Sequence, residues 1–322
     1  GYASLGAETL GSRSVAIGNS ALGTQNFTNA LNPYNVAVGY YAGQAVTTGM
    51  QNTLTGGHAG GALTDADFNV AMGYNALTTD TLGSKSVAVG YHALKTQNFT
   101  SATDAHNTAV GYQAGGNITT GLRNTIMGGL AGDALTDADY NVALGDNALT
   151  SDTLGSRSVA IGSATLESQN FSSATNSNNT AIGFQAGNGV TTGTKNTYIG
   201  SLAGDLCDDG VENTAVGYQS LSANMGDENT ACGSIALSVA TGVHNTAVGR
   251  AAGFEITSGD NNVAIGADAL RTGSPGGAVT TGSNVIGLGD ENITAAHIQV
   301  SLTVASDERD KTDFTDLDVG LD

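Results

Sequence analysis

The chain has 322 residues, of which 47 are glycine and only 5% are aromatic, and it contains no tryptophan. Side chains large enough to fill the thick core of a compact enzyme are therefore scarce, so alanine, valine, isoleucine and threonine must form narrow layers instead. The 29 acidic residues outnumber the 10 basic ones, and the net charge of −19 argues against nucleic acid as a partner. Because no apolar run reaches the roughly 20 residues that cross a bilayer, we expect no membrane insertion.

A five-residue phrase first occurs at residues 14–18 and then returns along nearly the whole chain. It consists of asparagine or serine, valine or threonine, alanine, an aliphatic residue and glycine. Most intervals between successive copies are short, as from Gly56 to Gly73, but some are four residues longer, as from Gly18 to Gly39. The order of the intervals defines a 72-residue super-repeat, in which Gly18, Gly90 and Gly162 are equivalent. Repetition of this kind is typical of solenoids.

Each copy of the phrase predicts a short strand. Side chains alternate along a strand, so in residues 86–90 Val87 and Val89 point one way and Ala88 the other. Both faces are apolar, which favours strands that stack in parallel within one chain and are covered on both sides. The predicted fold is an all-β parallel β-solenoid, or β-roll, of about 16 coils and on the order of 77 Å long. We expect the alanine face to form the interface of a homotrimer.

The longer coils carry an insertion that contains Phe27, Phe99 or Phe171. We expect these loops to project from the solenoid at regular intervals. The two cysteines, Cys207 and Cys232, lack a metal-type spacing and are predicted to be free, small core residues.

Aromatic residues directly follow many of the turn glycines, and they are candidate receptor-binding residues: Tyr40, Tyr74, Tyr91, Tyr112, Phe184 and Tyr218. Because the coils are in register, these rings should form a partial ladder along one edge. The rings could stack against sugars, or they could simply cover the edge of the coil and pack on the next coil.

Asp-Ala-Asp sequences occur in two equivalent loops and supply four candidate metal ligands: Asp65, Asp67, Asp137 and Asp139. Carboxylate oxygens are the ligands that Ca²⁺ prefers. Glycine-rich calcium repeats have a tighter spacing, so a solvated acidic turn is the alternative, and no other cofactor is expected.

Residues 107–114, with the sequence Asn-Thr-Ala-Val-Gly-Tyr-Gln-Ala, resemble the head repeats of trimeric autotransporter adhesins. The similarity covers about residues 1–283. It implies a left-handed parallel β-roll that packs with two further copies of itself, although the coils here are longer than is common in that family.

The pattern fades after Gly266, and residues 284–305 are expected to form a β-rich connector. Residues 306–322 begin with Ser-Asp-x-Arg-x-Lys and resemble the start of the peptidase S74 intramolecular chaperone domain of phage tail fibres. The resemblance implies that Ser306 is the nucleophile of a self-cleavage reaction and Lys311 its base. Ser306 could also cap a helix. We expect no enzyme activity beyond one self-cleavage event, and that event requires a complete chaperone domain.

The two resemblances together suggest a bacteriophage tail fibre that acts in host attachment, located in the virion and extracellular after release. Its expected partners are two further copies, other tail proteins, and a glycan or protein of the host cell surface. The rival hypothesis is the head of a bacterial trimeric surface adhesin, and the chaperone-like sequence favours the phage. An ice-binding solenoid would need a regular threonine array, but valine replaces threonine in many copies.

Overall fold

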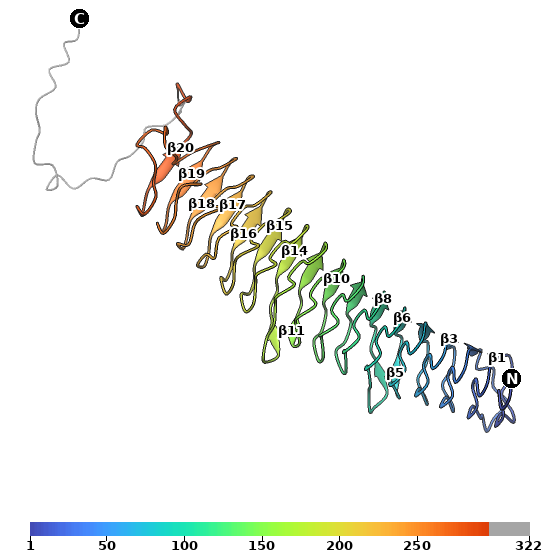
Figure 1. The fold of residues 1–322 in the computed structure, drawn as a ribbon. Coiled ribbons are helices and arrows are strands. Elements are labelled where there is room, and N and C mark those ends of the chain that lie inside the picture. Colours follow the sequence, from blue (N-terminus) through green and yellow to red (C-terminus); the bar gives the residue numbers. More distant parts are fainter. Residues whose placement is uncertain (296–322) are drawn as a thin grey trace, which may run out of the picture.

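The computed structural model describes residues 1–295 of the chain. These residues form a parallel β-solenoid, whose coils stack along one axis as a slender rod (Figure 1). The described range contains strands and turns but no helix. The predicted all-β solenoid is therefore confirmed.

Sixteen strands of three residues form one parallel sheet along the rod. They are β1 (Val15–Ile17), β2 (Val36–Val38), β3 (Thr53–Thr55), β4 (Val70–Met72), β6 (Val87–Val89), β8 (Thr108–Val110), β9 (Thr125–Met127), β10 (Val142–Leu144), β12 (Val159–Ile161), β14 (Thr180–Ile182), β15 (Thr197–Ile199), β16 (Thr214–Val216), β17 (Thr230–Cys232), β18 (Thr246–Val248), β19 (Val263–Ile265) and β20 (Ile286–Leu288). Two small parallel pairs join β5 (Gly83–Ser84) to β7 (Thr103–Asp104) and β11 (Gly155–Ser156) to β13 (Thr175–Asn176).

The register between neighbouring strands follows the phrase, because each alanine lies opposite the equivalent residue of the next coil. Ala88, for example, pairs with Ala71 on one side and with Ala109 on the other. At the far end Ile286 of β20 pairs with Val263 of β19, so the sheet continues beyond residue 283 into the segment expected to be a separate connector. Residues 296–305 of that segment lie outside the described residues.

The phrase alanines face the interior of the coil. Ala88 and Ala109 are fully buried, whereas Val87 and Val89 on either side of Ala88 are half-buried and face outward. The prediction that the alanine face is the subunit interface is therefore wrong. The alternation of side chains along each strand was predicted correctly. The alanine, however, points into the narrow interior of the coil, where the leucines that follow the turn fill the remaining space.

Side-chain volume is balanced within this narrow core. At three equivalent positions of the super-repeat, a larger residue replaces the alanine: Leu54, Ile126 and Tyr198. Glycine then replaces the leucine on both sides of it, and a Cβ atom on Gly187 or Gly204 would lie only 2.9 or 2.6 Å from the Tyr198 ring.

The turn glycine that closes each strand has no room for a side chain. Gly128 has φ +141°, and a Cβ atom there would lie 2.3 Å from the carbonyl oxygen of Gly145 in the next coil. We expect Gly128→Ala to lower the free energy of unfolding by about 2–3 kcal/mol in urea denaturation. Gly129→Ala is the matched control, because a Cβ atom there would meet only a side-chain atom, the Asp146 Oδ1, which can rotate away, and no backbone. Equal losses for the two neighbours would contradict this account.

The three insertion loops share a hydrogen bond to their phenylalanine, as the super-repeat predicts, but only the second and third form a strand pair, β5–β7 and β11–β13. A threonine of the preceding coil donates its hydroxyl to the carbonyl of the phenylalanine in each loop, as Thr81 does to Phe99 at 2.8 Å. The phenylalanine rings of these loops are buried, since Phe27, Phe99 and Phe171 are only 2, 6 and 5% exposed, whereas the residues that follow them, such as Thr28 and Thr100, are exposed. The Phe99 and Phe171 rings pack against the preceding coil, where a Cβ atom on Gly83 or Gly155 would lie only 2.7 or 2.8 Å from them.

Candidate recognition site and assembly face

The aromatic residues that follow the turn glycines lie in one column along the rod, and all six candidates are about half exposed: Tyr40, Tyr74, Tyr91, Tyr112, Phe184 and Tyr218. Only three of these rings stack. The ring centroids of Tyr74 and Tyr91 are 5.8 Å apart, and those of Tyr91 and Tyr112 are 5.4 Å apart with an interplanar angle of 6°. Within residues 1–295, Phe184 and Tyr218 have no aromatic neighbour at stacking distance.

Tyr40 is separated from this stack by one coil, in which Gly57 occupies the column. The neighbouring His58 ring fills part of the gap, since its ring centroid lies 5.4 Å from that of Tyr40 and 6.3 Å from that of Tyr74. The ladder expected from the sequence is therefore a stack of three rings, with the other candidates apart from it.

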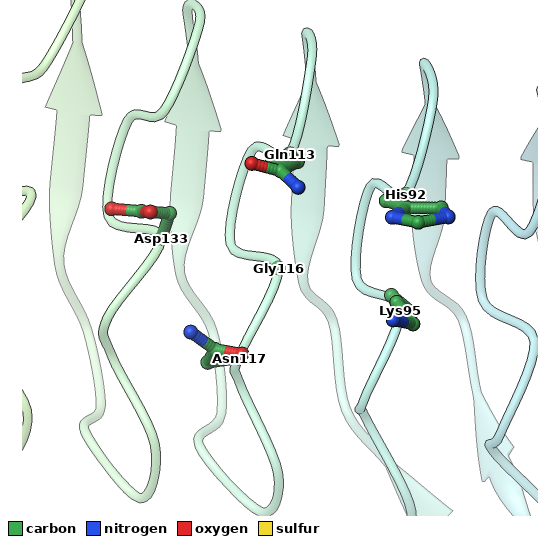
Figure 2. Close-up of a pocket in the computed structure, with 6 residues that line it drawn as sticks. All are labelled: His92, Lys95, Gln113, Gly116, Asn117 and Asp133. Atoms are coloured by element: carbon green, nitrogen blue, oxygen red, sulfur yellow. The ribbon is translucent and has the colours of Figure 1, made fainter.

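A shallow pocket of about 90 Å³ is lined in part by His92 and Gln113, which directly follow the stacked residues Tyr91 and Tyr112 in the chain (Figure 2). Three successive coils line it, with the residues His92, Lys95, Gln113, Gly116, Asn117 and Asp133. Burial, together with the charge of Lys95, lowers the pKa of His92, which favours the neutral imidazole at pH 7. The lining therefore offers hydrogen-bond donors and acceptors with one charge of each sign. This pocket was not predicted, because it forms only once the coils are in register.

The four aspartates proposed as calcium ligands tie neighbouring coils together: Asp65, Asp67, Asp137 and Asp139. Asp65 accepts a hydrogen bond from the Thr48 hydroxyl at 2.6 Å, and Asp67 accepts one from the Met50 N–H at 2.7 Å. The same two bonds recur at Asp137 and Asp139 in the next super-repeat. Burial raises the pKa of Asp67, against the opposing effect of the Met50 N–H. In the described part of the chain no three His, Cys, Asp or Glu side chains are grouped to hold a metal, and calcium binding stays a prediction.

Ser306 and Lys311 lie outside the described residues. Their roles in self-cleavage therefore stay a prediction.

A buried ladder of asparagines, which was not predicted from the sequence, runs beside the main sheet. Its members occupy the first position of the phrase, directly before a strand: Asn35, Asn52, Asn69, Asn107, Asn124, Asn141, Asn179, Asn196, Asn213, Asn229, Asn245 and Asn262. The Asn124 side chain accepts a hydrogen bond from the Asn141 N–H at 2.9 Å and donates one to the Ala138 carbonyl at 2.7 Å. Each rung therefore satisfies buried backbone groups of adjacent coils. The recurrence of asparagine before the strand was the available signal.

Serine replaces asparagine once in every super-repeat, and the insertion loop then supplies a glutamine. Gln97 donates to the Asp80 carboxylate at 2.6 Å and to the Ser86 hydroxyl at 3.0 Å, and it accepts from Asn107 at 2.8 Å. Glu8 with Gln25 and Asp152 with Gln169 repeat the arrangement. The three insertions therefore share one role, which is to supply a glutamine that completes the hydrogen bonds inside the coil.

The outward face of the main sheet carries an apolar stripe at one of its two strand positions, whereas the other, the first of each strand, is threonine in 8 of the 16 strands. Its third strand position holds an apolar residue in 15 of the 16 strands, and Thr55 is the exception. Met127, Ile265 and Leu288 in this position are 50, 45 and 62% exposed. Fifteen steps of about 4.8 Å make this stripe roughly 72 Å long. Exposed apolar patches of this extent mark interaction surfaces.

The two cysteines lie in different surroundings. Cys207 is buried, as predicted, but Cys232 is exposed, because it occupies the third position of β17 in the outward stripe. The prediction of a core position for Cys232 is wrong for the same reason as the assignment of the alanine face.

No known protein-family model matches the chain, and no curated protein matches it either. A search of residues 1–295 finds no helix with the length and apolar character that crossing a membrane requires.

Proposed function

We propose that the chain is a segment of a homotrimeric bacteriophage tail fibre, which spaces or presents a host-recognition surface. The observation that carries the proposal is the apolar stripe on the outward face of the main sheet. Water covers this stripe in a single chain, and burial of apolar area at about 25 cal/mol per Å² favours an assembly that hides it.

The geometry of the stripe favours identical partners. It occupies the same strand position in nearly every coil and follows the strand spacing, so parallel copies of the chain match it coil by coil. Closed symmetry then limits the assembly, and the acidic remainder of the surface opposes further lateral association. The resemblance to trimeric adhesin heads supports three copies.

The phage assignment rests on the sequence from Ser306 to Lys311, which resembles the start of the self-cleaving chaperone domain of tail fibres. The alternative remains the head of a bacterial surface adhesin, which would use the same solenoid and the same stripe. In the phage proposal the partners are other tail proteins and a host-surface glycan or protein, and the location is the virion.

Immunogold electron microscopy with antibodies against this chain separates the two functions. We expect label on the tail fibres of virions and none on uninfected bacteria that lack the phage genome. Label on the surface of such bacteria would identify the adhesin instead.

Self-cleavage is tested in the longer protein that carries a complete chaperone domain. Ser306→Ala should leave an uncleaved trimer, and Lys311→Ala should do the same, because one removes the nucleophile and the other its base. Electrophoresis of the purified proteins measures the release of the domain. Normal release from the Ser306→Ala protein would leave the serine only its alternative role as a helix cap.

A further inference from the structure

The stack of tyrosines ends at Tyr112, and the outer face of that ring is open. The next residue in the column is Gly129 and the one after it is Asp146, two coils or about 9.6 Å further along the rod. A Cβ atom on Gly129 would have only the Asp146 carboxylate within 4 Å, so the Tyr112 ring does not cover this position.

The tilt of the rings explains the opening. A Cβ atom on Gly57 would lie 3.3 Å from the Tyr74 ring, so that ring leans toward the N-terminal end of the rod. Tyr91 and Tyr112 follow with interplanar angles of 17° and 6° and therefore lean the same way. Space accordingly remains on the C-terminal side of Tyr112, above the backbone of Gly129.

Polar side chains border the open space above Gly129, which is called the Gly129 step below. Asp146 leans toward it from the next coil, with its Oδ1 atom 2.9 Å from the position of a Gly129 Cβ atom. The pocket of Figure 2 is linked to this position through the chain, because Gln113, which follows Tyr112 directly, lines it together with Asn117 and Asp133. An aromatic face beside planar amide and carboxylate groups matches a ligand that is apolar on one face and carries hydroxyl groups on its rim.

We infer that the open face of Tyr112, the Gly129 step and the adjoining pocket bind one neutral sugar unit of a surface glycan. The sugar ring lies flat between Tyr112 and Asp146, where it takes the place of a fourth ring in the stack. Its hydroxyl groups donate to the carboxylates of Asp133 and Asp146 and exchange hydrogen bonds with Gln113 and Asn117. The inference rests on the proposed function, since it names the class of host receptor that the fibre would bind.

The charge of the site selects neutral over acidic sugars. Asp133 and Asp146 supply two negative charges against the one positive charge of Lys95, and the chain as a whole carries a net charge of −19, so a sugar acid would be repelled. The hydroxyl groups of a neutral sugar instead form charge-assisted hydrogen bonds with these carboxylates.

The test fills the step without disturbing the coil. Gly129→Tyr adds a ring at the sugar position, and its Cβ atom meets only the flexible Asp146 side chain. The assembled protein is applied to an array that carries neutral and acidic oligosaccharides, and the neutral oligosaccharide that gives the strongest signal is then titrated by calorimetry. We expect Gly129→Tyr and Tyr112→Ala each to weaken binding at least tenfold. Tyr112→Phe should bind as the parent does.

Tyr218→Ala is the matched control, because Tyr218 is an equally exposed ring of the same column that lies outside the stack. It should leave binding unchanged. Binding to acidic oligosaccharides alone, no binding to the array, undiminished binding by Gly129→Tyr, or an equal loss from Tyr218→Ala would each overturn the inference. The electron-microscopic result is independent of these outcomes: label on tail fibres without sugar binding would overturn this site alone, and label on bacteria with Gly129-sensitive binding would overturn only the phage assignment.

Discussion

Replacement of Asn124 by alanine is expected to lower the free energy of unfolding by about 4 kcal/mol, because it leaves two buried backbone groups without partners. These are the N–H of Asn141 and the carbonyl of Ala138, which both bond to the Asn124 side chain. An orphaned buried group costs about 1–3 kcal/mol. The midpoint and slope of urea denaturation, followed by circular dichroism, measure the loss.

Asn98→Ala is the control for this prediction. Asn98 is exposed and accepts one hydrogen bond from the Thr81 hydroxyl at the surface, so its loss should change the stability by no more than about 0.5 kcal/mol. If both variants unfold at the same urea concentration, the ladder has no special part in stability.

The double substitution Val89→Asp and Met127→Asp is expected to yield monomers where the parent protein forms the proposed trimer. Both side chains lie in the outward stripe, so the coil can keep its fold while the interface would have to bury two unpaired charges in each copy. Sedimentation equilibrium should give about three times 32.0 kDa for the parent and one times that mass for the variant, with an unchanged circular dichroism spectrum.

Asn98→Asp with Asn170→Asp is the control for assembly. Both residues are exposed in the insertion loops, so this protein carries the same added charge away from the stripe and should stay trimeric. A monomeric parent protein, or a trimeric Val89→Asp and Met127→Asp variant, would contradict the proposed interface.

The fold could be predicted from the sequence because the phrase fixes both the strand and its register. Alternation alone could not decide which face turns inward, since both faces are apolar. Residue volume indicates which face turns inward. Tyr198 shares the alanine position and has Gly187 and Gly204 in the neighbouring coils, a compensation that is needed only in a closed interior.

The candidate site could be predicted only in part. The position of each ring in the column follows from the repeat, so the common edge was predictable. Which rings touch depends on the coils between them, and Gly57 and Gly129 interrupt the column on either side of the three stacked tyrosines. The pocket depends on side chains from three coils, such as Lys95, Asn117 and Asp133, whose convergence no single repeat reveals.

The asparagine ladder has a consequence for how the length of the rod can vary. One super-repeat runs from each serine of the ladder to the next, as from Ser86 to Ser158, and the glutamine and carboxylate beside each serine complete the hydrogen bonds across that boundary. A gene could therefore lose or duplicate one such stretch without exposing an unmatched donor or acceptor in the interior. Removal of a single coil could instead separate a serine from its glutamine. Rods of this design would thus differ in length by steps of four coils, or about 19 Å, rather than coil by coil.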